Sequence, residues 1–427
     1  MKKIYNKDLK VFYILWSTQG LSQLGSSITA FALTLWLYEK TGSALNTAAL
    51  TICTYVPYIL MSIFAGALSD RFDKKRTMLV CDTIAALCTI LVLVLYKLDM
   101  LQIWHLYVIN AFSGLMNTIQ EPASEVATTL IVPKEYYQKT CGLESLTRSL
   151  VSILNPLIST ALYGIAGLEL VITVDLSTFL IAFVALAFWV KIPKVASEKQ
   201  ENVLKLAKEG LVYLKRTPLI LTMILFMSGV NLVASAFDAV LPGFVIPNPK
   251  GGTHMLGVVT SFSGLAMVAG SLIVSVLPKP KDRIRVIYLT MLFSLGTENF
   301  FMAFSREPVV WCFAQIIGWI LVPIMSANQN VILKNTVPVD LQGRIYACRN
   351  TLQFFTIPIG LFLGGFMVDE ICEPYMSNNV TNETLTFLFG SGKGSGAALA
   401  MFILGVVGAL LCFLSGQRLK KYKYVES

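Results

Sequence analysis

The sequence predicts an all-α integral membrane protein whose chain crosses the bilayer twelve times. Of its 427 residues, 55% are hydrophobic and 14% are charged, whereas a soluble domain carries about 25% charged residues. Apolar runs recur along the chain, and each is about as long as the roughly 20 residues that a helix needs to cross a membrane. The alternating ten-residue strands of a membrane barrel do not fit runs of this length.

Twelve apolar runs are the predicted crossing helices. In order, they are residues 11–37, 46–68, 78–96, 104–130, 141–163, 168–190, 219–245, 255–277, 284–304, 308–333, 344–368 and 396–416.

Lysine and arginine residues set the predicted orientation of these helices. If the N-terminus is cytoplasmic, the segments on that side hold 27 of these residues and the opposite loops hold five. Because positive residues concentrate on the cytoplasmic side, both termini are predicted to be cytoplasmic. The net charge of +9 then reflects the orientation of the helices in the membrane, and it suits an anionic inner leaflet. No basic domain remains that could bind nucleic acid.

The longest polar interruption, residues 191–218, separates six runs from six. We therefore predict an N-terminal six-helix bundle over residues 1–190, a cytoplasmic linker over 191–218 and a C-terminal six-helix bundle over 219–427. Three leucines of the linker fall near one helical face, so it either lies along the membrane surface or is a charged connection between the bundles.

A weak repeat relates the two halves. The stretches "IVPKEYYQK" and "TVPVDLQGR" align Pro133 with Pro338 at an offset of 205 residues. The same offset aligns a stripe of polar or small residues in the fourth run with a corresponding stripe in the tenth. The aligned pairs are Asn110 with Gln315, Gly114 with Trp319, Asn117 with Val322, Glu121 with Ser326 and Glu125 with Asn330. Repeated halves with a site at their interface are typical of secondary transporters.

A dense group of charges follows the second run. Six of the seven residues from Asp70 to Arg76 are charged. The basic ones hold this turn on the cytoplasmic side, but Asp70 adds nothing to that signal, and topology does not explain Gly66 four residues earlier.

The stretch G-x-x-x-D-R-x-x-K-K-R, Gly66 to Arg76, resembles the loop signature of the major facilitator superfamily. With twelve runs divided six and six, this resemblance covers the whole chain. The ordered stretches "YEKTGSA", "EGLVYLKRTP" and "FGSGKGSG" are similar, more narrowly, to the bacterial macrolide-efflux branch of drug:proton antiporters. Many proton-coupled members carry an arginine where the fourth run has Asn110.

The resemblance implies that this loop is a cytoplasmic latch made of Gly66, Asp70, Arg71 and Arg76. Gly66 would let two helices approach closely, and Asp70 would face the positive N-terminus of the eleventh run. Arg76 would pair with an acid, either Glu125 or Asp82. Such contacts, formed only while the cytoplasmic side is closed, would bias the protein between its states.

Polar residues inside the apolar runs are costly and are therefore functional candidates. The resemblance places runs one, four, seven and ten around a central cavity. The candidate proton and substrate residues are Gln19, Gln23, Asn117, Glu121, Glu125 and Asp238. Structural alternatives stay open: helix–helix hydrogen bonds for the glutamines, pairing with the loop for Glu125, and an outer-gate hydrogen bond for Asp238. Asp82, Asp175 and Glu298 lie in peripheral runs and are predicted to be structural.

The function that these features imply is export of a hydrophobic or amphiphilic small molecule, such as a macrolide-like drug, by alternating access with proton antiport. The protein would be a monomer in the bacterial plasma membrane, with protons, membrane lipids and its small-molecule substrate as partners. The sequence contains no metal-ligand cluster, phosphate-binding loop or nucleophile signature, so neither a cofactor nor an enzymatic activity is predicted. The alternatives are a lipid or lysolipid flippase on the same fold and a membrane partner or sensor that transports nothing.

Overall fold

The computed structural model describes residues 2–71, 73–133, 136–193 and 203–422. Helices make up its regular structure throughout these ranges, and none of the described residues lies in a β-strand. The chain divides into two compact units, residues 1–37 with 53–203 and residues 38–52 with 204–427.

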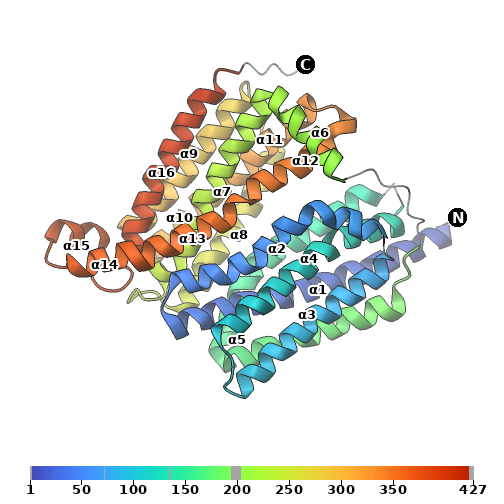
Figure 1. The fold of residues 1–427 in the computed structure, drawn as a ribbon, viewed down its shortest axis with the longest axis horizontal. Helices are drawn as coiled ribbons and strands as arrows, with labels where there is room; N and C mark the ends of the chain where they lie inside the picture. Colours follow the sequence, from blue (N-terminus) through green and yellow to red (C-terminus); the bar gives the residue numbers. More distant parts are fainter. Residues whose placement is uncertain (1, 72, 134–135, 194–202, 423–427) are drawn as a thin grey trace. The chain divides into compact units, whose positions relative to one another are not determined.

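Most of α1 to α5, followed by the π-helix η2, forms the first unit (Figure 1). The bounds are α1 Lys2–Thr41, α2 Ala44–Arg71, α3 Lys74–Lys97, α4 Ile103–Ile131, α5 Tyr137–Val184 and η2 Ala185–Trp189. At the core, Phe12 of α1, Met78 of α3, Ala123 of α4 and Leu186 of η2 pack together and are buried. Burial of such apolar side chains holds these helices against one another.

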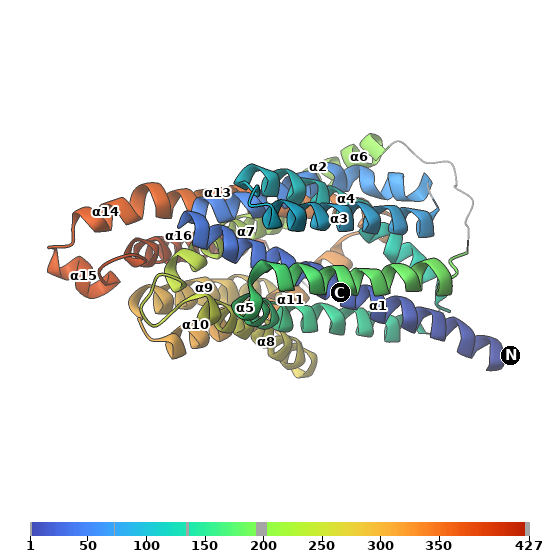
Figure 2. The ribbon, with the colours of Figure 1, turned by 90° about the horizontal axis from the view of Figure 1, so that it is seen from below.

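The helix α5 contains two predicted crossings. Its backbone leaves helical geometry at Ala166 and Gly167, where Gly167 has a φ of 64°. Glycine adopts this left-handed conformation without strain, so the chain turns back there and divides α5 into two legs (Figure 2).

The second unit consists of helices α6 to α16 together with residues 38–52. The bounds are α6 Val203–Arg216, α7 Pro218–Val245, α8 Thr253–Val276, α9 Arg283–Phe304, α10 Pro308–Ile320, α11 Val322–Thr336, α12 Val339–Phe354, α13 Thr356–Phe366, η3 Met367–Cys372, α14 Glu373–Asn378, α15 Glu383–Phe389 and α16 Ser395–Leu419. The tenth predicted crossing comprises α10 and α11, which are separated at Leu321, two residues before Pro323. The eleventh comprises α12, α13 and η3.

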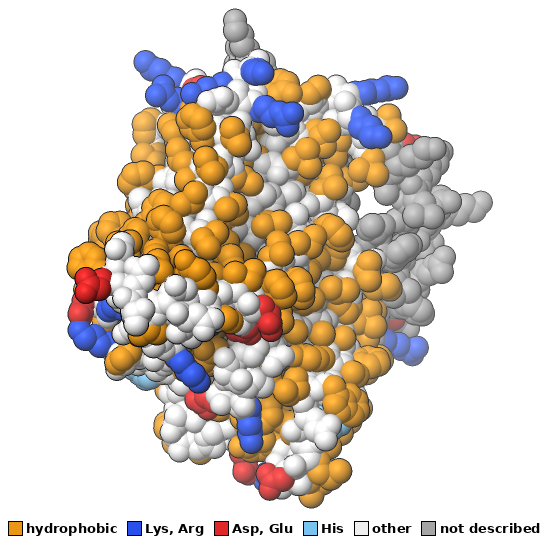
Figure 3. Space-filling model, turned by 60° about the vertical axis from the view of Figure 1, so that its left-hand side comes forward, with side chains coloured by type: hydrophobic (Ala, Val, Ile, Leu, Met, Phe, Trp, Pro, Cys, Tyr) orange, Lys and Arg blue, Asp and Glu red, His pale blue; other side chains and the backbone are white. Residues whose placement is uncertain are grey.

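All twelve predicted crossings lie in helices. By length and composition, nine helices of the described chain qualify as membrane spans on their own, and one of these is the doubled α5. The helices α1 and α4 are long enough but are not among the nine, because polar residues interrupt their apolar runs. On the face shown in Figure 3, hydrophobic side chains form a broad band, and Lys and Arg gather at one end. Phe293 and Val309 are 60% and 80% exposed, as suits a surface that meets lipid.

The unit boundaries add detail to the predicted division. Residues 38–52, the end of α1 and the start of α2, belong to the second unit. Ala48 of α2 packs there against Ala239 of α7 and Leu361 of α13. The linker contains α6, whose Leu214 is buried and whose Tyr213 hydroxyl donates to the Thr336 carbonyl at 3.1 Å. The exact boundaries at residues 190 and 218 stay predictions.

Candidate functional site

The first unit encloses a polar cavity of about 540 Å³ between α1, α3, α4 and α5. This volume is within the range of small-molecule sites, about 300–1,000 Å³. Five of the predicted site residues line it together: Gln19, Gln23, Asn117, Glu121 and Glu125. They meet because residues four apart share one face of a helix, and the polar faces of α1 and α4 are turned toward the same space.

Negative charge predominates in this cavity. Its lining includes five carboxylates, those of Asp82, Glu121, Glu125, Glu144 and Asp175, and Arg148 is its basic side chain. Clefts lined by charges of one sign concentrate ligands of the opposite sign. The arrangement therefore favours a cation.

Aromatic side chains supply the apolar part of the lining. Phe12, Trp16 and Phe179 are all at the cavity. The Nε1 of Trp16 is buried and has no hydrogen-bond partner among the described residues, so it is the aromatic face of Trp16, and not its N–H, that serves the lining. Cations are attracted to aromatic faces, so this lining suits an amphiphilic ligand that carries a positive charge.

Glu121 and Glu125 are both exposed to the open cavity. The Tyr58 hydroxyl of α2 donates to Oε2 of Glu121 at 3.3 Å. Glu125 lies near Glu144 and Arg148, whose charges act on it with opposite signs. Sequence reasoning missed Tyr58, because nothing in its local pattern separates it from other aromatic residues of an apolar run.

Asp82 and Asp175 were expected to be structural, yet both line the cavity. Asp82 of α3 accepts from the side-chain amides of Gln19 and Gln120, at 3.4 and 2.5 Å. Asp175 accepts from the Ser26 hydroxyl at 3.1 Å. Both acids are thus held in place by neutral donors while they contribute negative charge to the lining.

A glycine brings Asp175 close to α1. At Gly25, a Cβ would lie 3.2 Å from the Cα of Asp175 and would collide with the Thr178 hydroxyl. The second leg of α5 therefore packs directly against the α1 backbone. In the sequence, Gly25 within the first apolar run was the signal that could have predicted this close contact between α1 and α5.

The charged group after α2 is only partly within the described structure. Gly66, Asp70 and Arg71 belong to the last turns of α2, but their side chains lie outside the described residues, as does the expected contact of Asp70 with the eleventh crossing. Asp73 is the N-cap of α3, and its Oδ1 accepts from the backbone N–H of Arg76 at 3.0 Å. The Arg76 side chain is exposed and forms no ion pair with Asp82 or Glu125.

Lys75 has a definite role in this group. Its Nζ donates to the carbonyls of Ala187 and Val190, each at 2.8 Å. These carbonyls close the sixth crossing, where the helix dipole favours a cation. Lys75 therefore fastens α3 to the end of η2.

Asn110 does not line the cavity. It stands at the position where the superfamily resemblance leads one to expect an arginine. Its amide donates to the Leu106 carbonyl at 2.9 Å, and its Oδ1 accepts from the Thr54 hydroxyl at 3.4 Å. It thus binds α4 to α2.

Asp238 lies on α7 in the second unit and is exposed. Its stripe neighbours are engaged with the backbone: Asn231 donates to the Gln353 carbonyl at 3.1 Å and Ser235 to the Asn231 carbonyl at 2.5 Å. No hydrogen bond joins Asp238 to another described residue.

Sequence reasoning did not single out Asp369, which forms the best-developed polar contact of the second unit. Its carboxylate accepts from the Ser43 hydroxyl at 2.6 Å and from the backbone N–H groups of Ala44 and Leu45 at 3.1 and 2.8 Å. These groups begin α2, where unpaired N–H groups and the helix dipole favour an anion. Asp369 in η3 therefore caps α2.

The same region contains further polar contacts. Thr253 donates to Glu39 at 3.0 Å. Burial and the nearby carboxylates of Glu373 and Asp369 raise the pKa of Tyr38, so its hydroxyl keeps its proton in the physiological range.

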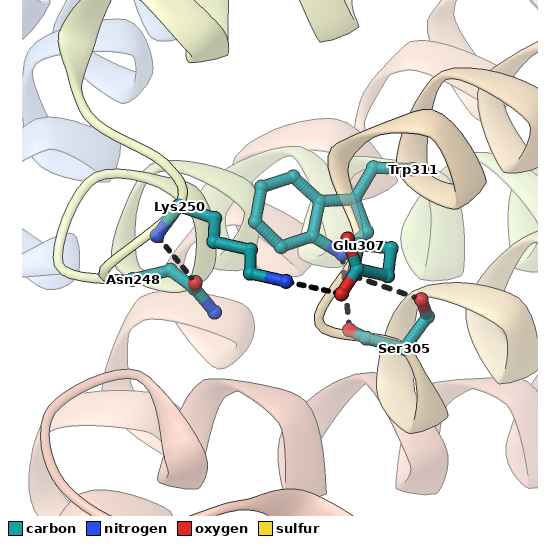
Figure 4. A network of polar contacts seen from close by, with 5 residues as sticks. All are labelled: Asn248, Lys250, Ser305, Glu307 and Trp311. Carbon is teal, nitrogen blue, oxygen red and sulfur yellow. Dashed lines mark hydrogen bonds and ion pairs between the residues drawn. The ribbon is translucent and has the colours of Figure 1, made fainter.

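The loops that precede α8 and α10 are joined by an ion pair between Lys250 and Glu307 (Figure 4). Asn248 accepts from the Lys250 backbone, and the Ser305 carbonyl accepts from the Trp311 indole at 3.0 Å. Arg306 lies over the ring of Phe244, 5.7 Å from its centroid. These contacts hold together the two loops that precede α8 and α10.

The profile of the Major Facilitator Superfamily matches residues 15–361 of this sequence. The chain belongs to the major facilitator superfamily. It is therefore a multi-pass membrane transport protein and not an enzyme, and the predicted twelve-helix major facilitator fold is confirmed.

Named relatives and solved structures agree with this assignment. The chain is 26% identical to Macrolide efflux protein A of Streptococcus pyogenes, over 87% of this chain and 92% of the relative. It is 23% identical to Multidrug efflux pump Tap of Mycolicibacterium fortuitum, over 81% and 86%. A bacterial homologue of the human lysosomal transporter Spinster, in an inward-facing and unoccupied conformation, matches with a TM-score of 0.72 at 14% identity, over 99% of both chains.

Proposed function

We propose that this protein is a secondary active exporter of amphiphilic small molecules that carry a positive charge, such as amine-bearing macrolides, and that it exchanges them for protons by alternating access. It would work as a monomer in a bacterial plasma membrane, among membrane lipids, with both termini in the cytoplasm. The distribution of Lys and Arg supports that orientation.

The acid-lined cavity of the first unit carries this proposal. A cation entering it meets five carboxylates and the aromatic side chains of Phe12, Trp16 and Phe179. The same carboxylates can take up protons once the cation leaves, which is the exchange that antiport requires. Relatives named for macrolide and multidrug efflux support export as the direction of transport.

The test uses the full-length protein in liposomes with an imposed pH gradient and a radiolabelled macrolide that carries an amine. We expect wild-type protein to move the drug until the gradient is collapsed by a protonophore. Glu121→Gln and Glu125→Gln each remove a cavity carboxylate that water can reach, and each should lower gradient-driven transport at least tenfold.

Glu169→Gln is the matched control. Glu169 lies outside the cavity and pairs with Lys97 on the surface at 2.6 Å, and such exposed pairs contribute about 0–1 kcal/mol. Its loss should leave transport unchanged. Drug movement that ignores the gradient would contradict antiport, lipid movement without a gradient would favour a flippase, and movement of neither would favour a membrane partner or sensor.

A further inference from the structure

A carboxyl group is buried between two helices of the second unit, outside the polar cavity of the first unit. Glu298 of α9 is 5% exposed, and its Oε1 has no hydrogen-bond partner among the described residues. Acids inside membrane helices are rarely kept without a functional role.

The neighbouring helix is shaped around this carboxyl. The Ser294 hydroxyl donates to the Gly318 carbonyl at 2.5 Å, which fixes how α9 packs on α10. A Cβ at Gly318 would collide with the carboxyl of Glu298. The glycine therefore provides the space that the acid occupies.

Other polar groups nearby are also unpartnered. Gln315 lies one turn before Gly318, is 2% exposed, and its Nε2 has no partner among the described residues. Asn299 donates to the Leu295 carbonyl at 2.7 Å, but its Oδ1 is buried without a partner. The Trp319 side chain lies beside Glu298. Buried polar atoms are nearly always hydrogen-bonded, so the orphaned atoms of Glu298 and Gln315, at the contact between α9 and α10, indicate a small ligand site.

Among the described residues, no basic side chain forms an ion pair with Glu298. The ionisable residues on the elements packed against α9 are Asp238 on α7, Cys312 on α10, Lys334 on α11, Glu383 on α15, and Cys412 and Arg418 on α16. Of these, Asp238 acts electrostatically on Glu298, and it has the same sign of charge. On α9 itself the nearest ionisable residue is Tyr288, about 15 Å away along the axis. On the α16 side, Gly405 lies against Asn299 and Gly408 against Leu295, both of α9.

An ionised carboxylate in these surroundings would be buried and unpaired, which costs far more than burial of a neutral acid. A protonated carboxyl is neutral, and its O–H can donate to a nearby acceptor. We propose that Glu298, with Gln315 and Trp319 around it, is a proton-binding site of the second unit that takes part in the transport cycle. Its part in transport rests on the proposed exporter function; proton binding by Glu298 does not.

Infrared spectroscopy of the full-length protein in a maltoside detergent, which has no ester carbonyl, tests the site directly. A protonated carboxyl has a carbonyl stretch separate from the amide and carboxylate bands, and at pH 8 the exposed acids no longer contribute to it. We expect this band in wild-type protein and in Glu169→Gln, and we expect it to be smaller by one carboxyl group in Glu298→Gln, because Asp82 and Asp175 are also buried and can contribute to it. Equal bands in wild type and Glu298→Gln would overturn the proposal.

The stability of the variant gives a second readout. Glutamine has the shape and the neutrality of a protonated glutamate, so Glu298→Gln should stay folded and melt within a few degrees of wild type. A variant that fails to fold would mean that the negative charge is needed, which contradicts a protonated Glu298. A Glu298 contribution to the band that disappears in sodium chloride, but not in choline chloride, would assign the site to a sodium ion instead.

Proton release on drug binding tests the link to transport. In weakly buffered detergent solution, we expect addition of the amine-bearing macrolide to release protons from wild-type protein and at most half as many from Glu298→Gln. Equal release from both would remove Glu298 from the transport cycle. If wild-type protein does not bind the drug at all, the proposed function fails, and the infrared band alone decides whether Glu298 holds a proton.

Discussion

The cap that Asp369 places on the start of α2 allows a quantitative prediction. The carboxylate holds three donors, two of them the backbone N–H groups of Ala44 and Leu45. In Asp369→Asn one oxygen becomes an amide nitrogen, so at least one of these bonds is lost together with the negative charge at the helix N-terminus.

The magnitude follows from the bonds that disappear. A hydrogen bond to a charged group contributes about 1.5–3 kcal/mol, and a charge at a helix N-terminus adds about 0.3–1 kcal/mol. Because Asp369 is only half-buried, the lower part of this range applies, about 1.5–3 kcal/mol. Each 1.4 kcal/mol is about a factor of ten in an equilibrium, so the start of α2 should open roughly 10- to 100-fold more often.

Amide hydrogen exchange followed by mass spectrometry, in lipid nanodiscs, measures this opening. Peptides that contain residues 43–50 should exchange about 10- to 100-fold faster in Asp369→Asn than in wild type, because the affected amides are themselves the donors. Glu370→Gln is the matched control, since Glu370 is the next residue, is exposed, and contacts none of these amides. Unchanged exchange in Asp369→Asn, or an equal increase in Glu370→Gln, would refute the capping argument.

Three further substitutions test other contacts. Lys75→Met removes both hydrogen bonds to the end of η2 and should lower the free energy of unfolding by about 1–3 kcal/mol, measured as a lower melting temperature, whereas the exposed Lys191→Met should change it little. Gly25→Ala introduces a collision with the second leg of α5 and should cost about 1–3 kcal/mol; Thr178→Ala in the same chain should recover part of this loss, and no recovery would argue against the packing described. Trp16→Leu removes an aromatic face from the cavity lining and should weaken binding of a cationic drug about 5- to 10-fold in an equilibrium binding assay.

The cap on α2 also resembles the latch expected at the other end of the same helix. The superfamily resemblance places Asp70, at the end of the second crossing, against the N-terminus of the eleventh. The structure contains the reciprocal contact: Asp369, at the end of the eleventh crossing, lies against the N-terminus of the second. If either contact is made in only one conformational state, its loss shifts the balance between states, so the exchange measurement on Asp369→Asn also reports on gating.

Periodicity and composition alone were sufficient for several features of this protein. Apolar runs of membrane length fixed the helical class and the twelve crossings, because a bilayer leaves a chain few other ways to satisfy its backbone. Residues at four-residue spacing on α4 placed Asn117, Glu121 and Glu125 on one face, and the structure brings that face to a cavity.

Tertiary structure alone decided which residues lie opposite that face and which acids share a site. Asp82 and Asp175, on runs expected to be peripheral, line the same cavity, and Glu298 lies against Gly318. The helical repeat of a sequence orders side chains around their own helix, but it does not say which neighbour faces them. That choice depends on how helices far apart in the chain pack, so Asp369 and the start of α2, separated by more than three hundred residues, could be joined only in the folded protein.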